Sequence, residues 1–266
     1  MKRVLPILAI VAAVAVPASA ADRLTDRDLK ELVSRIEDGR HKFEDALDGK
    51  LKNDTLRGSN GEVKVDKFLD DFQDNIKKLD DRLKPDYAAS AEAATVLHQA
   101  TAIDFFFRTQ PAGTKGDSEW KRLAVDLKAL AVAYGTDFPT PEGAPVRRLG
   151  DKEVAKIVDN IAEAADRLEH SLDNELKKDV TIDAPTRTSI VNVADQFAND
   201  ARKLRDKIKN GDPSSSEAQH LLERAMAIQS ILKAHQTPTS SGIWNGVPPM
   251  LQQVAGAYAI AVPAPR

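Results

Sequence analysis

The chain has 266 residues, no cysteine, and 38 basic against 41 acidic side chains, which gives a formal net charge of −3 at pH 7. The absence of cysteine excludes disulfide bonds, thiolate metal sites and c-type haem attachment. The mildly acidic balance argues against a nucleic-acid partner, because phosphate binding requires a basic face.

The first twenty residues have the pattern of a secretory signal peptide. Lys2 and Arg3 precede an apolar run over residues 4–16, and Ala18-Ser19-Ala20 is typical of a cleavage site. The apolar run is too short for a permanent anchor, although an uncleaved N-terminal anchor is the alternative. We therefore expect a mature chain that begins near Ala21, is periplasmic or secreted, and is not inserted in a membrane after cleavage.

The rest of the chain resembles itself. Shifted by 125 positions, residues 24–106 align with residues 149–231 without a gap, and Asp26, Phe72 and Leu79 fall on Asp151, Phe197 and Leu204. After one single-residue gap the alignment continues at a shift of 124, where Trp120 falls on Trp244, the second of only two tryptophans. This pattern predicts a tandem duplication of a unit of roughly 115–125 residues.

Each half shows four segments in which apolar residues recur at intervals of three and four, as in helices with one buried face. In the first half these segments are 25–51, 65–83, 93–106 and 120–134, and Ser59 and Glu62 have the spacing of a capping box before the second one. Their counterparts are 154–176, 190–208, 218–231 and a last helix that Pro248-Pro249 delays until near Pro249. No segment shows the alternation of a β-strand.

The expected fold class is therefore all-α, with two tandem homologous four-helix up-down bundles after the signal peptide. The expected domains are residues 1–20 (signal peptide), 21–139 (first bundle) and 140–266 (second bundle). Residues 136–146, which contain three prolines and a glycine, are expected to join the two bundles.

Histidines and carboxylates provide the candidates for a cofactor site. Glu217 and His220 have the Glu-x-x-His spacing of di-iron bundles, but the first half has Glu92 and Thr95 at the corresponding positions. For haem ligation, His98 and His220 lie on equivalent helices but not at equivalent positions, and Met226 is offset by one from the stripe residue Ala225. We expect no cofactor and no metal, and metal binding by Glu217 and His220 stays an open alternative.

No constellation of catalytic residues is evident. The serines occur in caps and loops, Gly-x-Ser-x-Gly and Gly-rich phosphate loops are absent, and paired carboxylates such as Asp70-Asp71 are adjacent residues that point in different directions on a helix. We therefore expect a protein that is not an enzyme.

Two features differ between the halves and mark candidate interaction residues. Arg40 lies where the first apolar stripe would continue, and we expect it to extend along the bundle edge or to contact an anion in a cleft. Phe106 belongs to the third stripe, so Phe105 and Phe107 are expected to pack against the other bundle, or else against a partner.

Together these patterns predict an exported, non-catalytic helical-bundle binding or scaffolding protein of the bacterial cell envelope. Its expected interaction surface is the seam between the halves or the Phe105 end of the third helix. A metal- or haem-binding periplasmic four-helix bundle is the alternative. The identity of a protein partner and the oligomeric state do not follow from the sequence.

Overall fold

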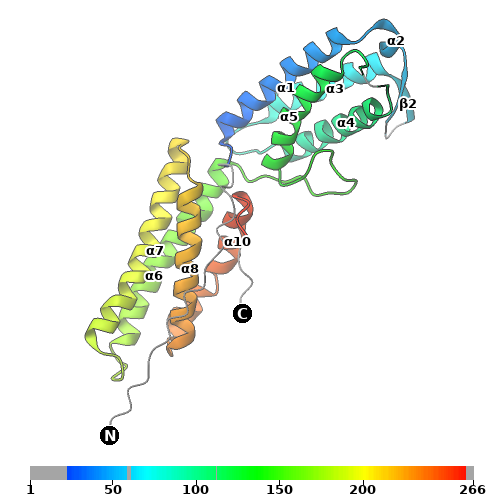
Figure 1. Ribbon diagram of the computed structural model, residues 1–266. Helices are drawn as coiled ribbons and strands as arrows, with labels where there is room; N and C mark the ends of the chain where they lie inside the picture. Colours follow the sequence, from blue (N-terminus) through cyan, green and yellow to red (C-terminus); the bar gives the residue numbers. More distant parts are fainter. Residues whose placement is uncertain (1–22, 59–60, 112, 262–266) are drawn as a thin grey trace.

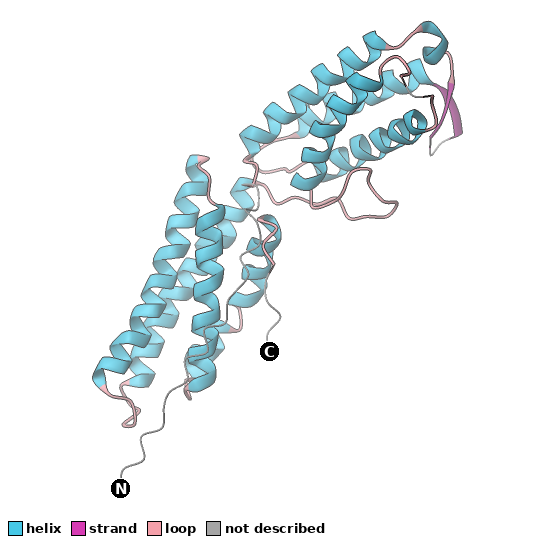
Figure 2. Ribbon diagram, viewed as in Figure 1, coloured by secondary structure: helices cyan, strands magenta, loops and turns pink. Residues whose placement is uncertain are grey.

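The structure, a computed structural model, describes residues 23–58, 61–111 and 113–261. Helices account for 73% of it, which confirms the all-α class. Two helical units lie end to end in an elongated molecule (Figure 1), and one short pair of strands is the only sheet in the described part of the chain (Figure 2). The predicted signal peptide, residues 1–20, lies outside the described residues.

The first unit has four long helices around one apolar core. Its elements are α1 (Asp26–Ala46), α2 (Gly49–Lys52), β1 (Thr55–Gly58), β2 (Gly61–Lys64), α3 (Val65–Arg82), α4 (Ser90–Arg108) and α5 (Asp117–Ala133). The predicted stripes face this core: Leu29, Leu32 and Phe72 are fully buried. None of the helices in the described ranges is both long and apolar enough to cross a membrane.

The first predicted helix is broken near its end. Helix α1 ends at Ala46 because Leu47 takes an extended conformation, and the Asp48 carboxylate then accepts a hydrogen bond from the Leu51 amide and starts α2. An aspartate that caps a new helix competes with continuation of the old one. The corresponding helix of the second unit, α6 (Asp151–Leu176), continues without a break.

A β-hairpin replaces the expected loop before the second helix, so the prediction of no strand was wrong. Thr55 pairs with Lys64 and Gly58 with Gly61, which has a positive φ of 105°. Gly61 can adopt this conformation because it has no Cβ, and β2 then occupies the positions where the capping-box spacing predicts the start of a helix. Glu62 lies in β2 and α3 begins only at Val65, so no helix starts at Ser59, which itself lies outside the described residues.

The second unit has its own apolar core, which is separate from the first. Its elements are α6, α7 (Ala184–Asn210), α8 (Ser215–Ala234), α9 (Pro238–Trp244) and α10 (Val247–Ala257). Helix α9 was not predicted. It begins where the Glu175 carboxylate accepts hydrogen bonds from the backbone amides of Thr239 and Ser240 at 2.8 and 3.0 Å.

The segment between the units packs on the first unit. Phe138 and Val146 contact the first core, and the buried Thr140 donates its amide to the Thr101 hydroxyl at 2.9 Å. Leu149 packs against the second core. The boundary between the two cores therefore lies between Val146 and Leu149, later than the predicted boundary at 139.

Candidate functional site

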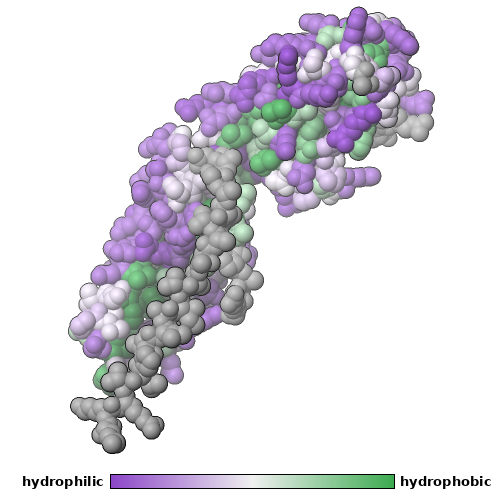
Figure 3. All heavy atoms as spheres, in the orientation of Figure 1, coloured by the Kyte–Doolittle hydropathy of each residue, from purple (hydrophilic) through white to green (hydrophobic). Residues whose placement is uncertain are grey.

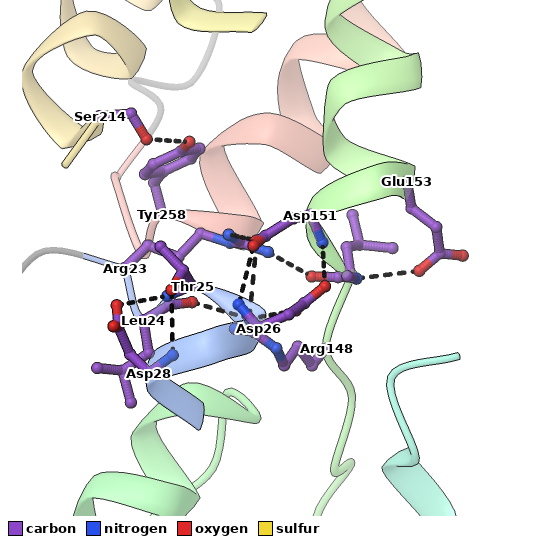
Figure 4. Close-up of polar contacts among 12 residues, drawn as sticks. Arg23, Leu24, Thr25, Asp26, Asp28, Arg148, Asp151, Glu153, Ser214 and Tyr258 are labelled. Carbon is purple, nitrogen blue, oxygen red and sulfur yellow. Dashed lines mark hydrogen bonds and ion pairs between the residues drawn. The ribbon is translucent and has the colours of Figure 1, made fainter. Parts of the chain in front are cut away.

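The two units meet where the first turns of α1 and α6 face each other (Figures 1 and 4). The Asp26 amide donates to the Asp151 carboxylate at 2.8 Å, and the Asp151 amide donates to the Asp26 carboxylate at 2.9 Å. Amides in the first turn of a helix have no partner within the helix, and the helix dipole favours a negative charge there. Each carboxylate therefore caps the helix of the opposite unit.

Two buried arginines complete this arrangement. Arg23 forms an ion pair with Asp151 and donates to the Leu149 carbonyl at 2.6 Å, whereas Arg148 donates to the Asp26 carboxylate and to the Leu24 carbonyl, both at 2.8 Å. The arginine side chains are only 6% and 3% exposed. A buried charge is tolerated only when it is paired and hydrogen-bonded, and both arginines meet that condition.

The surrounding hydrogen bonds follow the same reciprocal pattern. The Arg23 amide donates to the Ser215 hydroxyl and the Arg148 amide donates to the Ser90 hydroxyl, both at 3.3 Å. Because 23 and 148, and 90 and 215, are each 125 positions apart, these contacts recur with the roles of the units exchanged. The exception in the described ranges is a longer ion pair of 3.9 Å between Arg148 and Asp151. This is the geometry of an isologous, two-fold interface within a single chain.

A buried tyrosine ends the last helix of each unit beside this network. The Tyr134 hydroxyl donates to the Ala88 carbonyl at 2.6 Å, and the Tyr258 hydroxyl lies 2.8 Å from the Ser214 hydroxyl. Burial raises the pKa of both phenols, and the charges of Arg148 and Arg23 only partly oppose that rise. Both phenols are therefore neutral over the physiological pH range.

A cavity of about 940 Å³ opens beside the network, and residues of both units line it. We call it the junction groove. Its walls are mostly apolar, with Val125, Val132 and Ala133 from α5 on one side and Gly256 and Ala257 from α10 on the other. Val125 and Val132 are 69% and 61% exposed, and apolar residues gather over α5 beside the junction (Figure 3). A contiguous exposed apolar surface of this kind marks a binding site more often than chance exposure.

Positive charge borders the junction groove. Lys128 and Arg147 line it and are exposed, and neither forms an ion pair with any residue in the described ranges. The lining residues that the structure describes include no aspartate or glutamate. The groove thus combines an apolar floor with a cationic border.

Arg40 does not border a cleft. It is buried, forms an ion pair with Glu44 at 2.6 Å and donates to the Leu69 carbonyl at 2.7 Å. Its guanidinium therefore fixes α1 against α3, and the expectation of an anion contact in a cleft has no geometric support here.

Phe105 and Phe107 occupy different environments, and neither reaches the second unit. Phe107 is buried in the first core, with its ring centroid 5.1 Å from that of Phe43, which corrects the expectation that it faces outward. Phe105 is 58% exposed, with the Arg108 guanidinium 6.0 Å from its ring centroid. Because Ser90 at the start of α4 is the end that faces the junction, both rings lie at the far end of that helix. The expected packing between bundles was therefore wrong.

Glu217 and His220 are not arranged as a metal site. The Glu217 carboxylate is held by Lys207 at 2.8 Å and Lys203 at 3.6 Å, whereas His220 is exposed. Burial raises the pKa of Glu217, but the hydrogen bonds from Lys207 and Ser216, a backbone hydrogen bond and the charge of Lys207 together lower it by more, so its net pKa lies below the ordinary value. Within the described residues no cluster of three or more potential metal ligands occurs.

Sequence reasoning missed the residues of the junction, although a signal was present. Arg-Leu-x-Asp occurs at 23–26 and again at 148–151, at the same shift as the rest of the repeat. On α5 the exposed Val125 and Val132 and the partly buried Ala129 between them also have the intervals of one helix face, beside the core stripe. No family model, no curated protein and no solved structure matches this chain.

Proposed function

We propose that the chain is an exported, non-catalytic binding or scaffolding protein of the bacterial cell envelope, and that it binds its ligand in the junction groove. The N-terminal signal pattern supports export. The observation that carries the proposal is the apolar groove itself, a cavity of about 940 Å³ with exposed valines beside a buried polar network. Ligand sites are typically concave, apolar and of about this size.

We also propose that the groove arose through internal duplication of one bundle. Two four-helix bundles produced by internal duplication, packed head to head, would place the last helix of each copy on either side of the two-fold axis. The reciprocal contacts at a shift of 125 support this duplication. At the aligned positions Val132 and Gly256, one copy has a branched side chain and the other has none. The groove is thus widened on the side of the second unit.

A substitution at Gly256 tests whether the groove binds a ligand. A Cβ added there would meet no atom within 4 Å, so Gly256→Leu fills the groove without disturbing the core. Gly242 in α9 is equally free of neighbours and does not line the groove, so Gly242→Leu is the matched control. Replacing glycine within a helix does not weaken the helix.

The measurement is binding of a neutral apolar fluorophore, N-phenyl-1-naphthylamine, to the exported and purified protein. We expect saturable binding that Gly256→Leu weakens about tenfold or more, because a Leu side chain removes space and apolar contact. Gly242→Leu should bind as the natural protein does. Absence of saturable binding, or equal binding by both variants, would exclude the groove as the site.

A further inference from the structure

The geometry points to an anionic amphiphile with one hydrocarbon chain as the ligand of the junction groove, with its carboxylate against Lys128 and Arg147. This inference rests on the proposed function, because it requires that the groove binds a ligand. It adds the chemical class of that ligand and the residues that distinguish it from a neutral one.

The charge balance of the groove leads to this assignment. Four basic residues line it, but Arg23 and Arg148 are neutralised by Asp151 and Asp26 and their side chains are almost fully buried. Lys128 and Arg147 remain, exposed and without ion-pair partners in the described ranges. Two uncompensated cations beside an apolar floor complement a ligand that has an anionic head and an apolar chain.

The two sides of the groove differ, and this gives the ligand an orientation. Lys128 aligns with Gln252 of the second copy, so the uncompensated lysine is on the α5 side. The open space for a hydrocarbon chain is over Gly256, where no atom lies within 4 Å of an added Cβ. We therefore place the head group near Lys128 and Arg147 and the chain along Val132, Ala133 and Ala257.

The test compares three ligands with the same twelve-carbon chain and different head groups: dodecanoate, dodecanol and dodecyltrimethylammonium. The two ionic ligands are titrated below their micelle concentrations and dodecanol below its solubility limit, each as a competitor of N-phenyl-1-naphthylamine. The protein is purified after export, and mass spectrometry defines its N-terminus. We expect dodecanoate to bind about tenfold more tightly than dodecanol, with the cationic ligand weakest, and the preference to fall at high salt.

The double variant Lys128→Gln/Arg147→Gln should reduce the preference for dodecanoate over dodecanol to about twofold and leave dodecanol binding unchanged. The control is Lys121→Gln/Arg122→Gln, which removes the same amount of charge from exposed positions of α5 outside the groove. This control variant should still bind dodecanoate about tenfold more tightly than dodecanol.

The outcomes separate the two proposals. If dodecanol and dodecanoate bind equally and Gly256→Leu blocks both, the groove is a binding site but the carboxylate assignment is wrong. If none of the three binds, both proposals fail. If sedimentation shows a dimer that Gly256→Leu dissociates, and no amphiphile binds, the groove is occupied by a second copy of the chain and the amphiphile assignment is wrong.

Discussion

Asp26 and Asp151 exchange hydrogen bonds across the junction, each carboxylate accepting from the backbone amide of the other, at 2.8 and 2.9 Å. The two residues are 125 positions apart, the shift at which the sequence aligns with itself. Each aspartate thus serves three purposes: it begins its own helix, caps the opposite helix and pairs with the arginine that precedes the opposite helix. Because the hydrogen bonds are reciprocal, we expect the two aspartates to contribute similarly to the free energy of unfolding.

Replacement of either aspartate should therefore have the same effect. Asp26→Ala or Asp151→Ala removes the carboxylate that is hydrogen-bonded to a buried arginine and that caps the opposite helix, so each should lower the free energy of unfolding by about 3 kcal/mol. The double variant should cost less than the two single variants together, because they share one network. Urea unfolding followed by circular dichroism measures this.

The control for this prediction is Asp66→Ala. Asp66 is exposed in the first turn of α3, where its carboxylate accepts a hydrogen bond from the neighbouring Lys67 amide. We expect a change within about 0.5 kcal/mol. If Asp26→Ala and Asp151→Ala behave like this control, the reciprocal network does not stabilise the fold.

Phe107 and Phe105 should respond very differently to truncation. Phe107→Ala removes a ring that packs against Phe43 and Trp120 in the core, so the expected loss is about 3–4 kcal/mol of unfolding free energy. Phe105→Ala removes a largely exposed ring and should change that free energy by about 0.5 kcal/mol or less. Thermal unfolding compares the two variants, and similar losses would mean that Phe105 is also buried.

Glu175 should contribute an acid-sensitive part of the stability. Burial raises the pKa of its carboxyl, but hydrogen bonds from Ser240 and from the amide of Thr239 lower it by more, and the net pKa is below the ordinary value of 4.5. A carboxyl whose pKa is lowered by folding stabilises the protein above the unfolded pKa, and this stabilisation is lost as the pH falls through the folded pKa.

The variant Glu175→Gln should therefore be less stable than the natural protein at pH 7 and closer to it at pH 3. Unfolding by urea at a series of pH values measures the difference. Glu163→Gln, at an exposed position on α6, is the control and should follow the natural protein throughout. A gap between Glu175→Gln and the natural protein that stays constant with pH would contradict this role.

Tyr134 and Tyr258 should ionise only with difficulty in the folded protein. Burial raises the pKa of both phenols above the ordinary value of 10.0, so the folded protein keeps their protons at a pH where the unfolded chain releases them. The stabilisation is complete below the unfolded pKa and is lost as the pH rises through the folded pKa. Absorbance at alkaline pH follows phenolate formation directly.

This titration is best made in the variant Tyr87→Phe, because Tyr87 is the one tyrosine of the chain besides Tyr134 and Tyr258. The transition should then occur at a higher pH in the folded variant than in the same variant unfolded in guanidinium chloride. It should also coincide with loss of helical circular dichroism. Coincident titration curves for the folded and unfolded forms would show that the two phenols are solvated.

Local periodicity predicted most of the helices but failed where two local signals compete. Leu29, Leu32 and Val33 are buried as their stripe indicates, because their spacing alone puts them on one face. The strands Thr55–Gly58 and Gly61–Lys64 occupy the place where the capping-box spacing predicts a helix start, and at Asp48 a new cap ended the first helix early. In Phe105, Phe106 and Phe107, consecutive positions differ by about 100° on the helix, and the choice of the buried ring depended on Phe43 and Trp120 of other helices.

The sequence by itself determined the helical class, the apolar stripes of the long helices and the internal similarity at a shift of 125, because each of these is a pattern along the chain. Only the tertiary structure decided how the two units meet, which rings are buried and where a groove opens. The physical reason is that the first amides of α1 and α6, and the charges of Arg23 and Arg148, find their partners about 125 positions away. Periodicity records which face of a helix is apolar, but it carries no information on which distant polar group satisfies the helix end.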